Sequence, residues 1–151
     1  MNTCTQPITE HDFEAYYRLR YEVLRKPWNQ PLGSEKDADE ATSTHVCIKN
    51  EQDEIIAVCR LQAVDKDIAQ IRYMAIKENL HGKGLGKQIM NYTEGLAKEQ
   101  GFTAIHLHAR ENAVEFYKSC GYITQEKSYL LWGLIQHYLM TKSILVAGSR
   151  S

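Results

Sequence analysis

The chain has 151 residues, of which 43% are hydrophobic and 25% charged, and its formal net charge is −1 at pH 7. These values are ordinary for one compact globular domain. The near-neutral charge argues against a nucleic-acid partner held by a broad basic surface, and no apolar run is long enough to cross a membrane. The first residues, MNTCTQPITEHD, lack the charged-then-apolar pattern of a secretion signal, so we expect a cytoplasmic location.

The cysteines predict neither a metal site nor a redox pair. Cys4, Cys47, Cys59 and Cys120 form no CxxC motif, and no further ligand types cluster around His45 and Cys47. We therefore expect reduced thiols that pack inside the fold, and no bound metal.

The first predicted elements are a short strand from Thr3 to Ile8, interrupted by Pro7, and an amphipathic helix. Thr9 has the character of a helix N-cap, and Asp12 stands where it would complete a capping box. Helical spacing then continues through one mostly apolar face, at Phe13, Tyr16, Tyr17, Arg20, Val23 and Leu24.

A polar segment, Lys26 to Thr42, separates this helix from the next strand. It contains two prolines, one glycine and the acids Asp37, Asp39 and Glu40. This composition predicts an exposed loop or a broken second helix.

Three strand-like runs follow, at His45–Lys49, Ile55–Ala63 and Ile68–Ile76. Short turn-like segments join them, which favours an antiparallel meander. The clearest helix covers Gly84 to Gln100, and Gly101 stands where a left-handed residue closes a helix.

The last third of the chain predicts a strand, a short helix and two more strands. The strand covers Phe102 to Ala109, and Asn112 is expected to cap the short helix, with Glu115 at the capping-box position and Gly121 at its end. Tyr122 to Ser143 then supplies the final two strands. The fold class is therefore α+β, a single domain with a mixed, mainly antiparallel sheet flanked by helices.

The stretch HGKGLGKQIM, His81 to Met90, places three glycines at the start of the central helix. It fails the P-loop pattern, because Gly82 and Gly86 are one residue too close and Gln88, rather than Ser or Thr, follows Lys87. It also fails the GxGxxG dinucleotide pattern. A third interpretation is an anion site made by backbone amides at the positive end of the helix. The alternative is a tight turn with two solvated lysines.

The neighbouring motifs decide between these alternatives. Ile71-Arg72-Tyr73-Met74-Ala75-Ile76 precedes His81-x-x-Gly84-x-Gly86, and Asn112-Ala113-x-x-Phe116-Tyr117-x-x-x-Gly121-Tyr122 follows it. Together they resemble the GNAT superfamily of acyl-CoA-dependent N-acyltransferases, over roughly Thr5 to Lys142. We interpret residues 1–146 as one N-acetyltransferase (GNAT) domain and 147–151 as a disordered tail derived from an expression vector.

The resemblance implies acetyl-CoA as the acyl donor, with no metal. In similar proteins the pyrophosphate lies on the glycine loop, here His81, Gly82, Lys83, Gly84, Leu85, Gly86 and Lys87. His81 departs from the family pattern, which has Gln or Arg there, and lacks a guanidinium's fixed charge. The strand ending at Met74, Ala75 and Ile76 is expected to splay from the strand Phe102–Ala109, so that its backbone pairs with the pantetheine arm. Asn112 is also expected to contact the cofactor.

The resemblance also implies catalytic roles. A backbone N–H near Met74 would stabilise the oxyanion, and Tyr117 would protonate the leaving thiolate, because a phenol with a pKa of about 10 is a suitable donor. The base stays open among His108, Glu111 and Tyr73. His106 and His108 share the polar face of their strand, and His137 lies on a late strand.

These patterns predict an enzyme that acetylates a primary amine by direct attack within a ternary complex. The acceptor is a small-molecule or peptide amine, and Asp37, Asp39 and Glu40 would attract it unless they form only a solvated acidic loop. The apolar segment Tyr129 to Leu134 is either core or a homodimer interface. Two rival functions remain, a non-catalytic acyl-CoA-binding domain and an enzyme that binds nucleotide phosphates.

Overall fold

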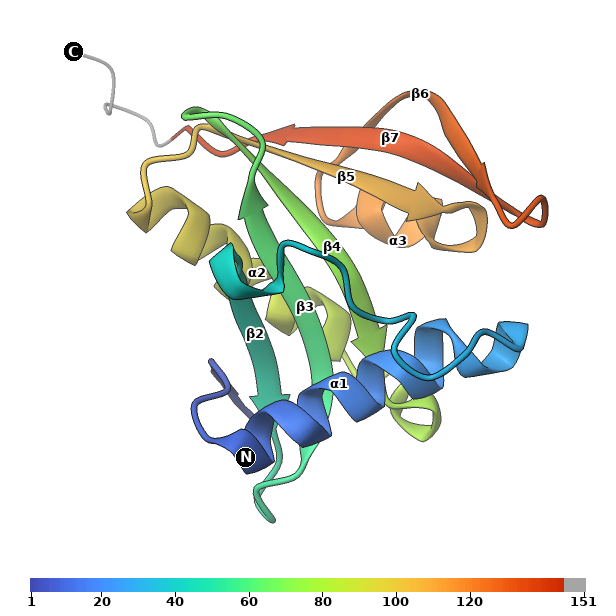
Figure 1. Ribbon diagram of the computed structural model, residues 1–151. Helices are drawn as coiled ribbons and strands as arrows, with labels where there is room; N and C mark the ends of the chain where they lie inside the picture. Colours follow the sequence, from blue (N-terminus) through green and yellow to red (C-terminus); the bar gives the residue numbers. More distant parts are fainter. Residues whose placement is uncertain (146–151) are drawn as a thin grey trace. The chain divides into compact units, whose positions relative to one another are not determined.

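A computed structural model describes residues 1–145 of the protein, so the segment 147–151 lies outside the described residues. The predicted element order is confirmed (Figure 1). The helices and strands are β1 (Thr3–Thr5), α1 (Glu10–Leu24), β2 (Thr44–Lys49), β3 (Ile55–Ala63), β4 (Ile68–Ile76), α2 (Leu85–Glu99), β5 (Ala104–Arg110), α3 (Val114–Ser119), β6 (Ile123–Leu131) and β7 (Ile135–Ser143).

The strands form a seven-stranded sheet in the order β1-β2-β3-β4-β5-β7-β6. Antiparallel pairs join β1 to β2, β2 to β3, β5 to β7 and β6 to β7. A parallel pair joins Ile68–Gln70 of β4 to Ala104–His106 of β5. The mixed, mainly antiparallel sheet predicted from the sequence is therefore confirmed.

Contacts within the chain divide it into two units. Unit 1 comprises Met1–Gln62 and Tyr73–Thr93, and unit 2 comprises Ala63–Arg72 and the described residues from Glu94 onward. Both β4 and α2 contribute residues to each unit. Within residues 1–145, no helix combines the length and apolar composition needed to cross a bilayer.

In unit 1, helix α1 lies across β2 and β3 (Figure 1). Its buried side chains Tyr16, Leu19 and Leu24 pack against Cys47 of β2 and Val58 of β3. The opposite face of β3 is also buried, because the Cys59 thiol lies 3.3 Å from the hydroxyl of Thr93 on α2. Burial on both faces explains why β3 reads as a nearly continuous apolar run.

The predicted capping box at the start of α1 is confirmed. The Thr9 hydroxyl accepts a hydrogen bond from the Asp12 N–H at 3.0 Å, and the Asp12 carboxylate accepts from the N–H of Thr9 and of Ile8. The ammonium of Lys49 on β2 donates to the same carboxylate at 2.9 Å. These contacts fix where α1 begins and attach it to the sheet.

The segment after α1 is a loop, as one of the two alternatives predicted. It contains only two short 3-10 turns, Lys26–Trp28 and Glu40–Thr42. The short helix α3 begins differently from the prediction. Asn112 lies inside a 3-10 turn, Glu111–Ala113, and Ala113 is the N-cap without a side-chain hydrogen bond. The predicted cap by Asn112 is therefore wrong, because the extra turn moves the helix start to Val114.

Glycine closes two helices as expected. Gly121 has a φ of 95°, and the hydrogen bonds from Gly121 N to Lys118 O and from Tyr122 N to Tyr117 O complete a Schellman motif. Gly101 ends α2 in the same way. These left-handed positions favour glycine because a Cβ atom would strain the backbone.

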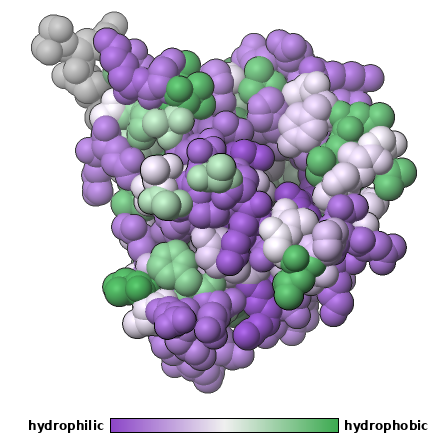
Figure 2. Space-filling view, in the orientation of Figure 1, coloured by the Kyte–Doolittle hydropathy of each residue, from purple (hydrophilic) through white to green (hydrophobic). Residues whose placement is uncertain are grey.

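The late apolar segment belongs to the surface of unit 2. Tyr129, Leu130 and Leu134 are exposed near the turn that joins β6 to β7, so the interpretation of this segment as core is wrong. On the face seen in Figure 2, hydrophilic side chains predominate and apolar ones form small separate groups.

We predict that Asp12→Asn lowers the free energy of unfolding of the protein at pH 7. In acid, the free energy of unfolding of the variant should depend less on pH than that of the wild type. Hydrogen bonds from the Ile8 N–H, Lys49 and the Thr9 N–H hold the pKa of Asp12 well below its ordinary value. A lowered folded-state pKa stabilises the fold above the ordinary pKa, and this stabilisation is lost as the pH falls. The substitution should lower the free energy of unfolding by about 1 kcal/mol at pH 7.

Urea unfolding at pH 7, 4 and 3 measures both effects. Glu14→Gln is the matched control, because it removes the same charge from an exposed position on the same helix. The interpretation would be contradicted if the Asp12 and Glu14 variants lost equal stability at pH 7.

Candidate functional site

The segment between β4 and α2 has a backbone that requires glycine. After β4, a 3-10 turn (Glu78–Leu80) leads to His81, and Gly82 and Gly84 then have φ values of 80° and 81°. A Cβ atom built on either glycine would meet nothing within 4 Å. Left-handed backbone conformation, rather than lack of room, therefore requires these glycines, and the backbone here is open to the approach of a ligand.

The start of α2 presents unpaired amide groups. The first hydrogen bond of the helix runs from Gln88 N to Gly84 O at 3.1 Å, so the preceding amides have no acceptor within the helix. Gly84 also has no side chain that could cap them. Buried Leu85 and Ile89 fix the helix in unit 1, while Lys83 and Lys87 are exposed beside its positive end. This arrangement suits an anion.

The predicted cofactor residues on β4 lie beside a local break in the regular strand conformation at Tyr73, which we call the kink. Tyr73 has a φ of 57°, a left-handed conformation that is rare for a bulky residue. It interrupts the regular alternation of β4 immediately before Met74. The His81 ring lies 3.2 Å from the carbonyl oxygen of Ile76 through Nε2, so the glycine loop folds back on the end of β4. Unit 1 therefore brings together the predicted residues of β4 and the glycine loop.

Two fully buried arginines lie next to this kink. The guanidinium of Arg60 donates to both carboxylate oxygens of Asp37, at 2.7 and 2.9 Å, and to Glu40 at 2.7 Å. Arg20 donates to Glu40 at 2.9 Å and to the hydroxyl of Tyr16 at 3.0 Å. We call Arg20, Arg60, Asp37 and Glu40 the arginine cluster. Both arginine side chains have no exposed surface, whereas the two carboxylates are partly exposed.

The arginine cluster changes the expected role of the acidic segment. Hydrogen bonds from Arg60 hold the pKa of Asp37 well below its ordinary value. Burial alone would raise the pKa of Glu40, but Arg20 and Arg60 hold it below its ordinary value. Asp37 and Glu40 are therefore paired anions, and neither forms part of a solvated acidic loop. Asp39 is exposed.

The burial and pairing of Arg20 and Arg60 were not predicted from the sequence. Arg20 lies on the apolar face of α1, and Arg60 lies within the buried run of β3. Charged residues are almost never fully buried unless they are paired. An arginine at each of these apolar positions therefore indicates ion pairs with the nearby acids.

In unit 2, the alternation of β5 is as predicted. Ile105, Leu107 and Ala109 are buried, while His106 and His108 are half-buried on the other face. Burial, followed by the charges of Arg72 and His106, lowers the pKa of His108. Within residues 1–145, its buried Nδ1 atom has no hydrogen-bond partner.

The other residues of unit 2 considered for catalysis, cofactor binding or the acceptor pocket have separate surroundings. Tyr117 is buried on α3, with its ring 5.1 Å from Phe116 and 6.0 Å from Tyr122. Asn112 is exposed, and the Glu111 carboxylate accepts a hydrogen bond from Tyr138 at 3.1 Å. His137 stacks on Tyr129 at 4.3 Å, and its Nδ1 lies 3.0 Å from the Ile135 carbonyl, which favours a structural role.

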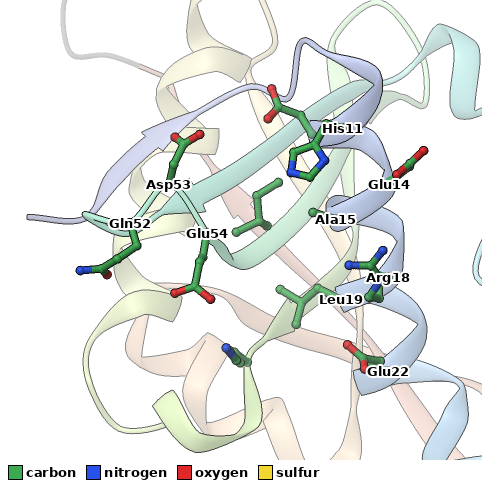
Figure 3. A pocket seen from close by; sticks show the side chains of 12 residues that line it. His11, Glu14, Ala15, Arg18, Leu19, Glu22, Gln52, Asp53 and Glu54 are labelled. Carbon is green, nitrogen blue, oxygen red and sulfur yellow. The ribbon is translucent and has the colours of Figure 1, made fainter.

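A groove of about 440 Å³ lies between α1 and the turn that joins β2 to β3 (Figure 3). Glu14, Arg18 and Glu22 line it from α1, and Asp53 and Glu54 line it from the turn. Asp53 already pairs with Lys49 at 3.6 Å. None of the predicted cofactor or catalytic residues lines this groove.

Comparisons with known proteins identify the chain. The model of the acetyltransferase (GNAT) family matches residues 10–122. The chain belongs to this family. It is therefore a GNAT-type acyltransferase, as the motifs predicted.

Individual GNAT proteins resemble the chain over most of its length. The N-acetyltransferase YjcF of Bacillus subtilis, itself uncharacterized, is 30% identical over 130 residues, which are 85% of this chain and 90% of YjcF. The crystal structure of a Lactobacillus plantarum protein assigned as an N-acetyltransferase has a TM-score of 0.85 and 21% identity, covering 95% of this chain and 99% of the other. An aminoglycoside 6'-N-acetyltransferase complexed with coenzyme A has a TM-score of 0.79 and 14% identity, covering 97% and 98%.

We predict that Gly84→Ala weakens coenzyme A binding and the fold, whereas Gly95→Ala does neither. Gly84 has a positive φ, at which an alanine costs about 1 to 2 kcal/mol. Gly95 lies inside α2 with open space around it, where alanine should stabilise the helix by about 0.5 to 1 kcal/mol. Calorimetric titration with coenzyme A should show a loss of about tenfold for Gly84→Ala.

The comparison isolates the anion site, because each variant adds one methyl group, Gly84→Ala immediately before α2 and Gly95→Ala inside it. Equal coenzyme A affinity in the two variants, both checked as folded, would remove the start of α2 from the binding site.

Proposed function

We propose that this acyltransferase moves an acetyl group from acetyl-CoA to the primary amine of a small molecule or peptide, by direct attack within a ternary complex. The observation that carries the proposal is the glycine-built start of α2, whose free amides suit the pyrophosphate of coenzyme A. Lys83 and Lys87 add positive charge beside it. A cytoplasmic location remains a prediction from the sequence.

The reaction needs few side chains. The neutral amine attacks the thioester carbon, and the carbonyl oxygen becomes an oxyanion that the Met74 N–H stabilises. The tetrahedral intermediate then expels the thiolate of coenzyme A, to which Tyr117 gives its proton. The nitrogen loses one proton to a base, so the products are an amide and the free thiol.

His108 is the base that the local chemistry favours. Its lowered pKa keeps the imidazole neutral at pH 7, so it has a free nitrogen to accept a proton. Glu111 is the alternative, since it lies at the end of the same strand. The hydroxyl of Tyr73 donates to the Asp37 carboxylate at 3.2 Å, which gives this tyrosine a different role.

Three of the four thiols are poor candidates for a covalent acyl-cysteine intermediate, which favours direct attack. Burial raises the pKa of Cys47 and of Cys59 to about 12, and it also raises the pKa of Cys4. Thiols with these pKa values are protonated at pH 7 and are poor nucleophiles.

Release of free thiol from acetyl-CoA across a panel of polyamines, amino sugars, amino acids and peptides tests the proposal. Turnover with at least one amine is expected. If acetyl-CoA binds but no amine gives turnover, the proposed acetyltransferase function is wrong and a non-catalytic acyl-CoA-binding function takes its place. If ATP raises the melting temperature more than coenzyme A does, the site binds nucleotide phosphates instead.

Tyr117→Phe is expected to lower kcat by at least tenfold and to change the KM for acetyl-CoA by less than twofold. The phenol acts on the departing thiolate, so its loss affects the chemical step. Steady-state kinetics with the best amine of the panel measure this. Tyr21→Phe is the control, since that hydroxyl donates to the carbonyl of Gln30 in the loop after α1. An unchanged kcat in the Tyr117 variant would exclude it as the acid.

The pH dependence of kcat/KM tests His108. A base must be neutral to work, and a lowered pKa extends the neutral form to more acidic solution, so activity should persist to a lower pH than the titration of an ordinary histidine would allow. His108→Gln is expected to lower the rate and to abolish this acidic limb. An acidic limb with the same midpoint in the variant would assign the base to another group, with Glu111→Gln as the next variant to measure.

A further inference from the structure

The kink at Tyr73 needs a physical cause. A left-handed conformation in a bulky residue costs about 1 to 3 kcal/mol and persists only when the surroundings hold it. Tyr73 lies in the middle of β4, where no turn demands such a conformation. Its side chain must therefore gain enough from its contacts to offset the strain.

The arginine cluster supplies those contacts. The guanidinium carbon of Arg20 lies 4.4 Å from the centre of the Tyr73 ring, and that of Arg60 lies 4.8 Å from it. The Tyr73 hydroxyl donates to the Asp37 carboxylate, which Arg60 holds through two hydrogen bonds. The ring therefore contacts two buried cations. Its hydroxyl donates a hydrogen bond to a carboxylate that Arg60 holds in place.

The conformation of Tyr73 sets the direction of the next amide. The N–H of Met74 belongs to the peptide group that follows Tyr73, so rotation about the Tyr73 backbone turns this N–H. In the proposed function, the Met74 N–H donates a hydrogen bond to the oxyanion. Such a donor stabilises the developing charge only when it points at it. A tyrosine held in the left-handed region can thus aim the donor without contacting the substrate.

We propose that Tyr73 is a positioning residue, which the arginine cluster holds in a left-handed conformation so that the Met74 N–H points at the thioester oxygen. The proposal rests on the proposed function. It also gives the buried arginines a role, because Arg60 holds Asp37, and Asp37 links the loop after α1 to the kink of β4. It differs from the role of general base, in which the tyrosine hydroxyl itself would accept the proton.

Three variants at position 73 separate these roles. Tyr73→Phe keeps the ring and the cation contacts, so kcat should fall only about threefold, whereas loss of a general base costs about a hundredfold or more. Tyr73→Ala removes the ring and disfavours the left-handed conformation, so kcat should fall at least tenfold. Tyr73→Gly lacks the ring too but adopts a positive φ readily, so it should recover at least threefold over the alanine variant.

Steady-state kinetics with folded protein give kcat and KM for each variant, with Tyr21→Phe as the control. The KM for acetyl-CoA should rise by a smaller factor than kcat falls, because the pyrophosphate site is unchanged even if the pantetheine-pairing segment 74–76 loosens. A tenfold rise of KM together with the fall of kcat, or a glycine variant no faster than the alanine variant, would overturn the proposal. A hundredfold loss in Tyr73→Phe would also overturn it.

A second measurement needs no amine acceptor. Hydrogen exchange of the peptide containing Met74, Ala75 and Ile76 should quicken in Tyr73→Ala and remain unchanged in Tyr21→Phe. Unchanged exchange in Tyr73→Ala would overturn the proposed clamp. If the wild-type protein turned over no amine while exchange changed as expected, the proposed function would fail and the clamp on the β4 backbone would stand.

Discussion

The burial of two guanidinium groups is the constraint on which the organisation of unit 1 depends. Arg20 and Arg60 have fully buried side chains, and an unpaired charge in such a place would cost several kcal/mol. Asp37 and Glu40 supply the compensating carboxylates, so the loop after α1 must fold back over the sheet. One set of charge-assisted hydrogen bonds therefore connects α1, this loop, β3 and the kinked part of β4.

The functional groups proposed here are largely backbone groups held by this framework. In the proposed site, the N–H groups at the start of α2 would bind the pyrophosphate where Gly82 and Gly84 have no side chains, and the conformation of Tyr73 would orient the Met74 N–H. His81 extends the same arrangement, because its ring contacts the carbonyl of Ile76.

Local chemistry made most of the fold predictable. The capping box of Thr9 and Asp12, the alternation of β5 and the closing glycines Gly101 and Gly121 each depend on neighbours in the chain, and each was predicted. The start of α3 was misjudged, because an extra 3-10 turn satisfied the backbone in place of the Asn112 side chain. The kink at Tyr73 could not be predicted, since it depends on arginines 13 and 53 residues away in the sequence.

The pairing within the arginine cluster also limits how an amine acceptor is recognised. Asp37 and Glu40 carry two negative charges, and Arg20 and Arg60 carry two positive charges within hydrogen-bond distance of them. Beyond the cluster these charges largely cancel, so they exert little attraction on a distant ammonium ion. Asp39 stays exposed and is not a member of this cluster. Selection of the acceptor should therefore depend on shape and short-range hydrogen bonds more than on a net negative charge of this loop.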